Sequence, residues 1–260
     1  MGKFDGYLIC SDVDGTFHMG DSIPGNSEAI EYFTRNGGSF TFCTGRTVDY
    51  LLRPDLNRLI NAPACLFNGS VIYDYRENRL LFQKQLCFSL GCLWEVLAPV
   101  RELIRQVYIY QNYKDEGIIL DNPGELPPEV AQLRGLKILF TTDAPEHTRL
   151  LRDFALGLPL ADCCYISMTW GLGLEFNPAE GTKGHSLTFI KNHLGNIHTA
   201  IGVGDYENDI PLLTHGDIGA AVENALPQVK AAASILLPHA AQCAFPALID
   251  LIESGKLLRR

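Results

Sequence analysis

The sequence predicts an α/β fold, with a Rossmann-like parallel-sheet core and an inserted α+β cap. At both ends of the chain, short apolar runs that end in polar or glycine-rich clusters alternate with helical patterns, which is typical of a parallel sheet covered by helices. Between about Lys84 and Pro178 the alternation gives way to a different mixture of strand-like and helical pieces. We therefore expect a discontinuous core of residues 1–83 and 179–260, with the insertion over 84–178.

The first core segment predicts the order β-α-β-α-β. Short apolar runs mark the strands, glycine pairs mark the stops, and an Asn-Gly pair after the third strand predicts a hairpin turn. The elements expected here are the strand Gly6–Asp12, the helix Pro24–Asn36, the strand Ser39–Cys43, a helical stretch toward Asn61, and the strands Ala64–Phe67 and Val71–Tyr73.

The insertion and the second core segment follow from the same signals. In the insertion we expect strands over Gln106–Tyr110, Ile118–Leu120 and Lys137–Phe140, and helices over Leu90–Arg101 and Pro145–Leu156. The returning core is expected to contain the helix Gly184–Leu194, the strands Ala200–Gly204 and Gly216–Val222, and a last helix near Phe245–Ser254.

Composition excludes several classes of protein. The chain of 260 residues is 47% hydrophobic, which excludes disorder, and its net charge of −9 disfavours nucleic acid as a partner. The N-terminus has no long apolar run and no stretch approaches the ~18 apolar residues of a membrane span, so we expect no membrane partner and a cytoplasmic location. The eight cysteines include no CxxC pair and lie mostly among apolar neighbours, so we expect them to be reduced, inert core residues.

The first candidate site lies where the first strand ends. Asp12 and Asp14 are two residues apart, so their side chains would share a face in a continuing strand. Gly15 then allows the backbone to turn sharply. Mg²⁺ prefers oxygen ligands, commonly one or two carboxylates with water and a substrate phosphate. An Asp-x-Asp pair alone is weak evidence for a metal site, because a solvated turn can contain the same residues.

Polar groups at three further element ends strengthen this interpretation. Thr44 and Gly45 close the second strand and offer a hydroxyl and an open backbone N–H to a phosphate. Lys183 stands at the entrance to a helix, where it would supply a point charge. The stretch Gly204–Asp209 follows a strand and again presents acidic groups. Each cluster alone could be a helix cap, but four clusters at the ends of one sheet indicate a single site.

Together these motifs resemble the haloacid dehalogenase superfamily of phosphotransferases. Within it, the chain resembles the sugar-phosphatase-like Cof branch, whose members carry a large cap. The four motifs occur in order as D-V-D-G-T at Asp12–Thr16, T-G-R at Thr44–Arg46, the lysine of G-T-K-G at Lys183, and G-D-Y-E-N-D at Gly204–Asp209. The resemblance implies a Mg²⁺-dependent phosphomonoester hydrolase acting on a small phosphate ester, with a sugar phosphate or phosphorylated sugar acid as the expected substrate.

The resemblance also implies a role for each matched residue. Asp12 would be the nucleophile that forms an aspartyl-phosphate, and Asp14 the general acid and base. The expected phosphate ligands are Val13, through its backbone N–H, with Thr44, Gly45, Lys183 and Asn208. The expected Mg²⁺ ligands are Asp12, Asp205 and the backbone carbonyl of Asp14, and Asp209 would orient metal-bound water or Lys183.

Two alternative functions remain open at this point. A phosphomutase shares the aspartyl-phosphate chemistry and returns the phosphoryl group to its substrate. A sensor would keep the fold and bind a phosphate ligand without turnover, although every matched catalytic position is present. The sequence leaves the assembly open between a monomer and a homodimer.

Substrate specificity is expected to lie in the cap, which closes over the leaving group in this family. The net charge of the cap is −4, which does not favour binding of a second phosphate group. The candidate contacts are Arg101, Arg134, Lys137, Tyr108, Tyr110 and Trp170, and the segment Thr169–Gly173 is a candidate substrate-facing loop. Two core residues depart from the usual motifs: His18 could face the cleft or be a bystander, and Tyr206 could narrow the site or lie on the surface.

Overall fold

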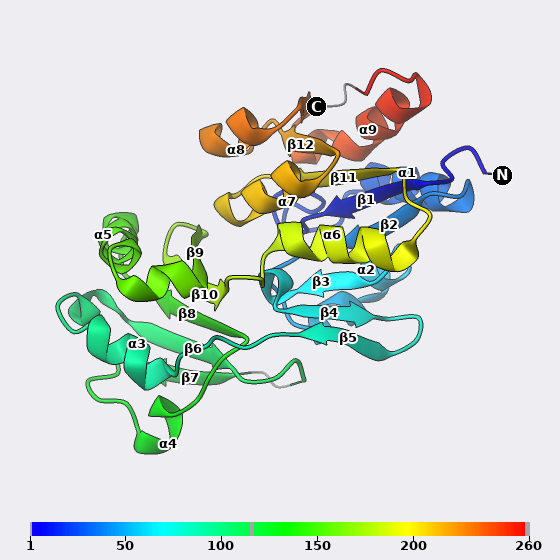
Figure 1. Ribbon diagram of the computed structural model, residues 1–260. Coiled ribbons are helices and arrows are strands. Elements are labelled where there is room, and N and C mark those ends of the chain that lie inside the picture. The colour runs from blue at the N-terminus through cyan, green and yellow to red at the C-terminus, as the bar shows by residue number, and fades with distance from the viewer. Residues whose placement is uncertain (1, 115–116, 258–260) are drawn as a thin grey trace.

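The computed structural model describes residues 2–114 and 117–257, which form three β-sheets flanked by helices (Figure 1). The strands are β1 (Tyr7–Ser11), β2 (Ser39–Phe42), β3 (Ala64–Leu66), β4 (Val71–Asp74), β5 (Arg79–Gln83), β6 (Gln106–Tyr110), β7 (Ile118–Asp121), β8 (Lys137–Thr141), β9 (Cys164–Thr169), β10 (Gly173–Pro178), β11 (Thr199–Gly204), β12 (Ile218–Val222) and β13 (Ile235–Leu237). The α-helices are α1 (Pro24–Arg35), α2 (Pro54–Asn57), α3 (Leu90–Val96), α4 (Pro128–Ala131), α5 (Pro145–Leu156), α6 (Lys183–Leu194), α7 (Ile210–His215), α8 (Pro227–Ala232) and α9 (Ala244–Glu253).

The central sheet is parallel and has the strand order β13-β12-β11-β1-β2. Its middle strands are buried on both faces, which explains why they are apolar throughout instead of alternating. From β1 the chain moves to β2 on one side, and it later returns to β11 on the other side. The strand order therefore reverses at β1, and such switch points are where open α/β sheets bind ligands.

Helices cover both faces of this sheet. In Figure 1, α6 and α7 pack together in front of the strands, and α1 packs against α9 on the far side. The helix α6 begins at Lys183 because the Thr182 hydroxyl caps it, accepting the N–H of His185. It ends where Gly195 adopts a φ of 72°, a conformation that favours glycine. The cap of α6 thus fixes Lys183 at the start of the first helical turn.

The expected third strand of the parallel sheet is found in a different sheet. β3 is linked to β2 only through one parallel bridge between Cys43 and Cys65, and it forms an antiparallel sheet with β4 and β5. The hairpin at Asn68-Gly69 is present, but its turn is a short 3₁₀ segment over Phe67–Gly69. β3 therefore pairs with β4, because the turn at Asn68-Gly69 brings the next strand directly back beside it.

The chain between these two core segments builds an antiparallel sheet of order β7-β6-β8-β10-β9. The helices α3 and α5 lie with it, apart from the parallel sheet (Figure 1). Its apolar cluster, which includes Leu93, Phe140 and Phe176, is separate from the larger cluster around the central sheet. We call this part the cap; the boundaries at 84 and 178 remain a prediction.

Two expected helices are shorter than predicted, and proline explains both. The stretch toward Asn61 divides into a 3₁₀ turn over Asp49–Leu52 and α2, because Arg53 is extended immediately before Pro54. The helix α3 ends at Val96, three residues before Pro99.

All eight cysteines are free thiols, as the sequence predicts, but Cys87, Cys92 and Cys163 are exposed, so the expectation that the cysteines are core residues is wrong for these three. Burial raises the pKa values of Cys43 and Cys65 well above the ordinary range, so these two thiols are poor nucleophiles. Across residues 2–114 and 117–257, no helix is both long and apolar enough to cross a membrane.

Candidate active site

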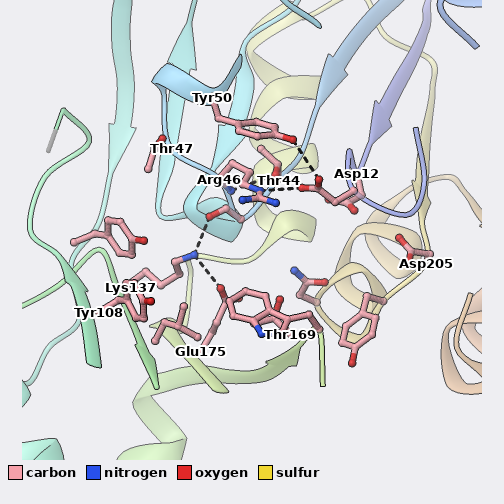
Figure 2. Close-up of a pocket in the computed structure, with 17 residues that line it drawn as sticks. Asp12, Thr44, Arg46, Thr47, Tyr50, Tyr108, Lys137, Thr169, Glu175 and Asp205 are labelled. Atoms are coloured by element: carbon pink, nitrogen blue, oxygen red, sulfur yellow. Dashed lines mark hydrogen bonds and ion pairs between the residues drawn. The ribbon is translucent and has the colours of Figure 1, made fainter. Parts of the chain in front are cut away.

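The predicted motif residues meet at the carboxyl ends of three neighbouring strands. Asp12 directly follows β1, Thr44 lies two residues beyond β2, and Asp205 follows β11. They open onto a cavity of about 600 Å³ between the core and the cap (Figure 2). The core wall of this cavity includes Asp12, Asp14, Thr44, Gly45, Arg46 and Asn208.

Lys183 connects two of the predicted acids. Its Nζ lies 2.7 Å from Oδ1 of Asp12 and 2.6 Å from Oδ1 of Asp209, and its side chain is 1% exposed. Burial alone would lower the pKa of this lysine, but the two carboxylates outweigh burial and raise it. Lys183 is therefore a fixed cation that reaches the cavity through Asp12.

Three carboxylates gather around this lysine. One oxygen from each of Asp12, Asp205 and Asp209 lies within 4.8 Å of the others. Burial, followed by repulsion from Asp209, raises the pKa of Asp205 to about 7, although the Thr16 hydroxyl donates to it at 2.6 Å. Burial also raises the pKa of Asp12. These clustered carboxylates are costly to keep ionised without a nearby positive charge. Their oxygen atoms are the ligands that a hard divalent cation prefers.

Both carboxylate oxygens of Asp209 accept hydrogen bonds from groups of the protein. Its Oδ2 accepts the backbone N–H groups of Asp205 and Tyr206, each at 3.0 Å, and its Oδ1 accepts Lys183. The side chain is fully buried. Asp209 thus holds both Lys183 and the loop that carries Asp205, which is consistent with the orienting role that the sequence predicts.

Asp14 lies at the exposed side of the site. Its carboxylate accepts Nε of Arg46 at 2.9 Å and the hydroxyl of Tyr50 at 3.2 Å, and its side chain is 45% exposed. The Arg46 guanidinium also stacks over the Tyr50 ring, 4.7 Å from its centroid. The sequence did not single out Tyr50, because it lies four residues beyond Arg46 in a segment without a motif.

The turn after β2 presents Thr44 and Gly45. The hydroxyl oxygen of Thr44 accepts the backbone N–H of Arg46 at 3.2 Å, which leaves its own hydrogen to donate. A Cβ on Gly45 would lie 2.9 Å from Oδ1 of Asn68, so a larger residue would collide there. Val13 has a fully buried side chain, and its carbonyl accepts the N–H groups of Phe17 and His18.

The cap supplies the opposite wall. Its lining residues are Tyr108, Tyr110, Lys137, Leu139, Trp170 and Glu175, with Thr169 beside the tryptophan (Figure 2). Of the segment Thr169–Gly173, Thr169 and Trp170 line the cavity and the other three residues do not; that this segment faces the substrate stays a prediction. Glu175 was missed, although a single acid in the apolar stretch of β10 is a signal that could have found it.

Other candidates lie elsewhere. Among the described residues, the cavity walls do not include Arg101, Arg134 or His18. His18 is 1% exposed and packs against Phe17, with Nε2 3.8 Å from Asp55. Burial lowers its pKa, so the neutral imidazole is favoured. Tyr206 does line the cavity, and it also packs against the apolar cluster of the cap.

With this geometry established, comparison with known sequences decides the family. Residues 9–91 and 128–245 match the family of haloacid dehalogenase-like hydrolases. The chain belongs to this family. The resemblance seen in the four motifs is thereby confirmed, and the chain is a hydrolase of this type.

Two named proteins are similar to this hydrolase over different lengths. The HMP-PP phosphatase of Yersinia enterocolitica is 26% identical over 240 residues, which cover 86% of each chain. The phosphoglycolate phosphatase of Sulfurisphaera tokodaii is 40% identical over 60 residues, which cover 23% of this chain and 26% of that protein.

Solved structures share the fold. The HAD subclass IIB sugar phosphatase BT4131 superposes with a TM-score of 0.76 at 16% identity, covering 97% of this chain and all of that chain. A HAD/COF-like hydrolase from Plasmodium vivax gives a TM-score of 0.72 at 18% identity, covering 96% of this chain and 97% of that chain. The predicted α/β class with a parallel-sheet core is confirmed.

Proposed function

We propose that this protein is a Mg²⁺-dependent phosphatase that hydrolyses the monoester of a small phosphorylated metabolite through an aspartyl-phosphate on Asp12. The observation that carries the proposal is the buried Lys183 ammonium, which is held between Asp209 and Asp12, the one of these three residues that lines the cavity. A nucleophilic carboxylate must keep one oxygen free and in place, and this ion pair does so by binding only Oδ1 of Asp12.

The carboxylate cluster fits a magnesium ion. Asp12 and Asp205 offer oxygen atoms within 4.8 Å of one another, and burial makes their charged forms costly without a cation. Together with the backbone carbonyl of Asp14, they would hold the ion. When bound, Mg²⁺ would neutralise charge on the substrate phosphate and on Asp12.

The remaining donors define where the phosphate would lie. The Thr44 hydroxyl, the backbone N–H of Gly45 and the amide of Asn208 border the cavity beside Asp12, and the N–H of Val13 is a further candidate. Oδ2 of Asp12 would attack phosphorus in line with the leaving oxygen, which forms the aspartyl-phosphate and breaks the ester bond. Lys183 would stabilise the acyl oxygen that it already contacts.

Asp14 would move the protons. In the first step its carboxyl would give a proton to the leaving alkoxide, and in the second its carboxylate would take a proton from the water that hydrolyses the aspartyl-phosphate. Arg46 and Tyr50 hold this side chain at the cavity, where it would be within reach of the ester oxygen. Inorganic phosphate and free Asp12 are the products of the second step.

The cap wall supports a compact leaving group that carries hydroxyl groups or a ring. Tyr108, Tyr110 and Trp170 offer faces that stack on sugar or heterocyclic rings. The similar proteins named above act on an HMP-PP, on phosphoglycolate and on a sugar phosphate. A sugar phosphate or phosphorylated sugar acid is the substrate class we propose.

The test is a panel of phosphate monoesters assayed for released inorganic phosphate. The panel should include sugar phosphates, phosphorylated sugar acids and heterocyclic phosphates, each with Mg²⁺ and with EDTA. We expect Mg²⁺-dependent release from at least one sugar-type ester. Absence of release from every ester at saturating Mg²⁺ would overturn the proposed activity and favour a phosphate-ligand sensor.

A further inference from the structure

A chain of buried polar side chains crosses from the cap into the phosphate-binding side of the core. Lys137 Nζ donates to Oε1 of Glu175 at 2.9 Å, and Oε2 of Glu175 accepts Nδ2 of Asn68 at 2.5 Å. Oδ1 of Asn68 in turn accepts Nδ2 of Asn208 at 3.0 Å. Lys137, Glu175 and Asn68 are 6%, 2% and 1% exposed. Water therefore cannot substitute for these partners at little cost.

The chain has a fixed direction. Lysine can only donate, so Lys137 requires an acceptor at residue 175. A carboxylate can only accept, so Glu175 turns the NH₂ group of Asn68 toward itself and leaves the Asn68 carbonyl for Asn208. Asn208 must then present its NH₂ group to Asn68. Nδ2 of Asn68 also donates to Oδ1 of Asn177 at 3.2 Å, and Asn177 in turn donates to the carbonyl of Phe67 at 2.8 Å. Glu175 and Asn177 thus together determine the orientation of two successive amides.

The far end of this chain lies against the predicted phosphate loop. Oδ1 of Asn68, which holds the NH₂ group of Asn208, is the atom that a Cβ on Gly45 would meet at 2.9 Å. Lys137 also donates to the carbonyl of Gly45 at 2.8 Å. The NH₂ group of Asn208 is therefore held on the Gly45 side of the cavity, where its second N–H can be given to a phosphate oxygen.

We propose that Glu175 is a positioning residue that sets the amide orientation of Asn208 for phosphate binding, acting through Asn68 and anchored by Lys137. This inference rests on the proposed function, since it concerns the same phosphate site. It assigns to a cap residue a role on the phosphate, whereas the rest of the cap wall faces the leaving group.

Glu175→Gln is the decisive substitution. Lys137 would still demand the oxygen of residue 175, so the new NH₂ group would face Asn68. Asn68 would then either meet that NH₂ group with its own, or turn its carbonyl toward residue 175. The turn would break its bond to Oδ1 of Asn177 and would turn Asn208 in the opposite sense. The carbonyl oxygen of Asn208 would then replace its NH₂ group near Gly45, and this oxygen would repel the bound phosphate.

The measurement is direct binding of inorganic phosphate, in the presence of Mg²⁺, by titration calorimetry. We expect Glu175→Gln and Asn208→Ala each to weaken phosphate binding about tenfold, and the double variant to bind no more weakly than Asn208→Ala alone. Additive effects, or binding by Glu175→Gln within twofold of the wild type, would overturn the inference. Binding does not require turnover, so failure of the proposed activity is scored separately by the ester panel.

A compensating substitution separates orientation from loss of packing. Asn68→Asp in the Glu175→Gln background restores the direction, because the amide introduced at position 175 would donate to the new carboxylate and Asn208 would again donate to residue 68. Asn177, which now accepts Nδ2 of Asn68 at 3.2 Å, would have to turn its own NH₂ group toward that carboxylate. Residue 68 has a φ of 60°, which Asp tolerates nearly as well as Asn, so the backbone accepts the change. We expect phosphate binding to recover by at least threefold over Glu175→Gln. No recovery in a folded double variant would overturn the inference, also where Glu175→Gln alone fails to fold.

Arg152→Gln is the matched control. Arg152 on α5 donates to Oε2 of Glu207 at 2.9 Å, so it forms an ion pair between cap and core that takes no part in the amide chain. We expect this variant to lower the melting temperature while leaving phosphate affinity within twofold of the wild type. An equal loss of phosphate affinity in Arg152→Gln would show that any cap–core contact has the same effect, and would overturn the specific role of Glu175.

Discussion

The two walls of the cavity are built in different ways. The core wall gathers acids and one buried lysine at the ends of β1, β2 and β11, and each group is fixed by short bonds to its neighbours. The cap wall carries three aromatic side chains, Tyr108, Tyr110 and Trp170, and Trp170 remains 58% exposed in the turn between β9 and β10. Tight fixation suits chemistry, whereas an aromatic wall with an exposed member suits recognition of a variable group.

The largest expected effect lies at the centre of the core wall. Asp12→Asn should lower kcat for phosphate release by on the order of 10⁴-fold, because the amide oxygen is a poor nucleophile. The fold should be retained, since Lys183 keeps Asp209 as a partner. Near-normal Mg²⁺-dependent activity in this variant would contradict the assignment of Asp12.

The buried lysine of the core should be the next most sensitive position. Lys183→Met leaves the carboxylates of Asp12 and Asp209 buried without their cation, at a cost of about 3–5 kcal/mol. We expect a melting temperature lower by on the order of 10 °C and a kcat lower by about 10²- to 10³-fold. A thermal melt and an ester assay test the two effects separately, and an unchanged kcat would remove Lys183 from the phosphate site.

A smaller and more selective effect is expected on the cap wall. Trp170→Ala should raise KM for the best sugar-type ester about tenfold, while kcat for a small aryl phosphate changes by less than about threefold. The residue lines the cavity and takes no part in the acid cluster. Equal losses for both esters would show that the cap wall contributes to chemistry, which would break the contrast between the walls.

The smallest effect concerns pH and stability without metal. The pKa of Asp205 is raised to about 7 in the folded chain, against about 3.9 for an unfolded aspartate. The native carboxyl keeps its proton where the unfolded one has lost it, so the free energy of unfolding falls as pH rises from about 4 to about 7. In EDTA we expect the melting temperature at pH 8 to lie on the order of 4 °C below that at pH 5.

Asp205→Asn provides the control for this dependence. The amide cannot titrate, so its melting temperature in EDTA should fall less between the same two pH values. A variant that loses as much stability as the wild type would assign the pH dependence to other groups.

Much of the fold could be predicted because its signals are local. The strand β1 is an apolar run ended by Asp12, and α6 begins where Thr182 caps it. The strands β10 and β13 were missed for opposite reasons. β10 is buried at every residue and lacks alternation, and β13 has only three residues.

The residues of the site also divide into those that could be predicted from the sequence and those that could not. Asp12, Thr44 and Asp205 could be predicted because parallel strands bring their own ends together, so a motif after each strand is enough. Glu175 and Asn68 could not be paired in advance, because they lie 107 residues apart and meet only where β10 returns to the core. Contacts that arise from tertiary packing have no fixed spacing in the sequence, so no motif indicates them.

The acid cluster has a consequence for which ion the site can hold. With all groups ionised, Asp12, Asp205 and Asp209 against Lys183 leave a formal charge of −2 in a buried volume. One divalent cation brings that sum to zero, whereas a monovalent ion leaves it negative and a trivalent ion makes it positive. Charge balance would thus favour a divalent ion before coordination geometry favours one element, and a substrate dianion would then enter a site without net charge.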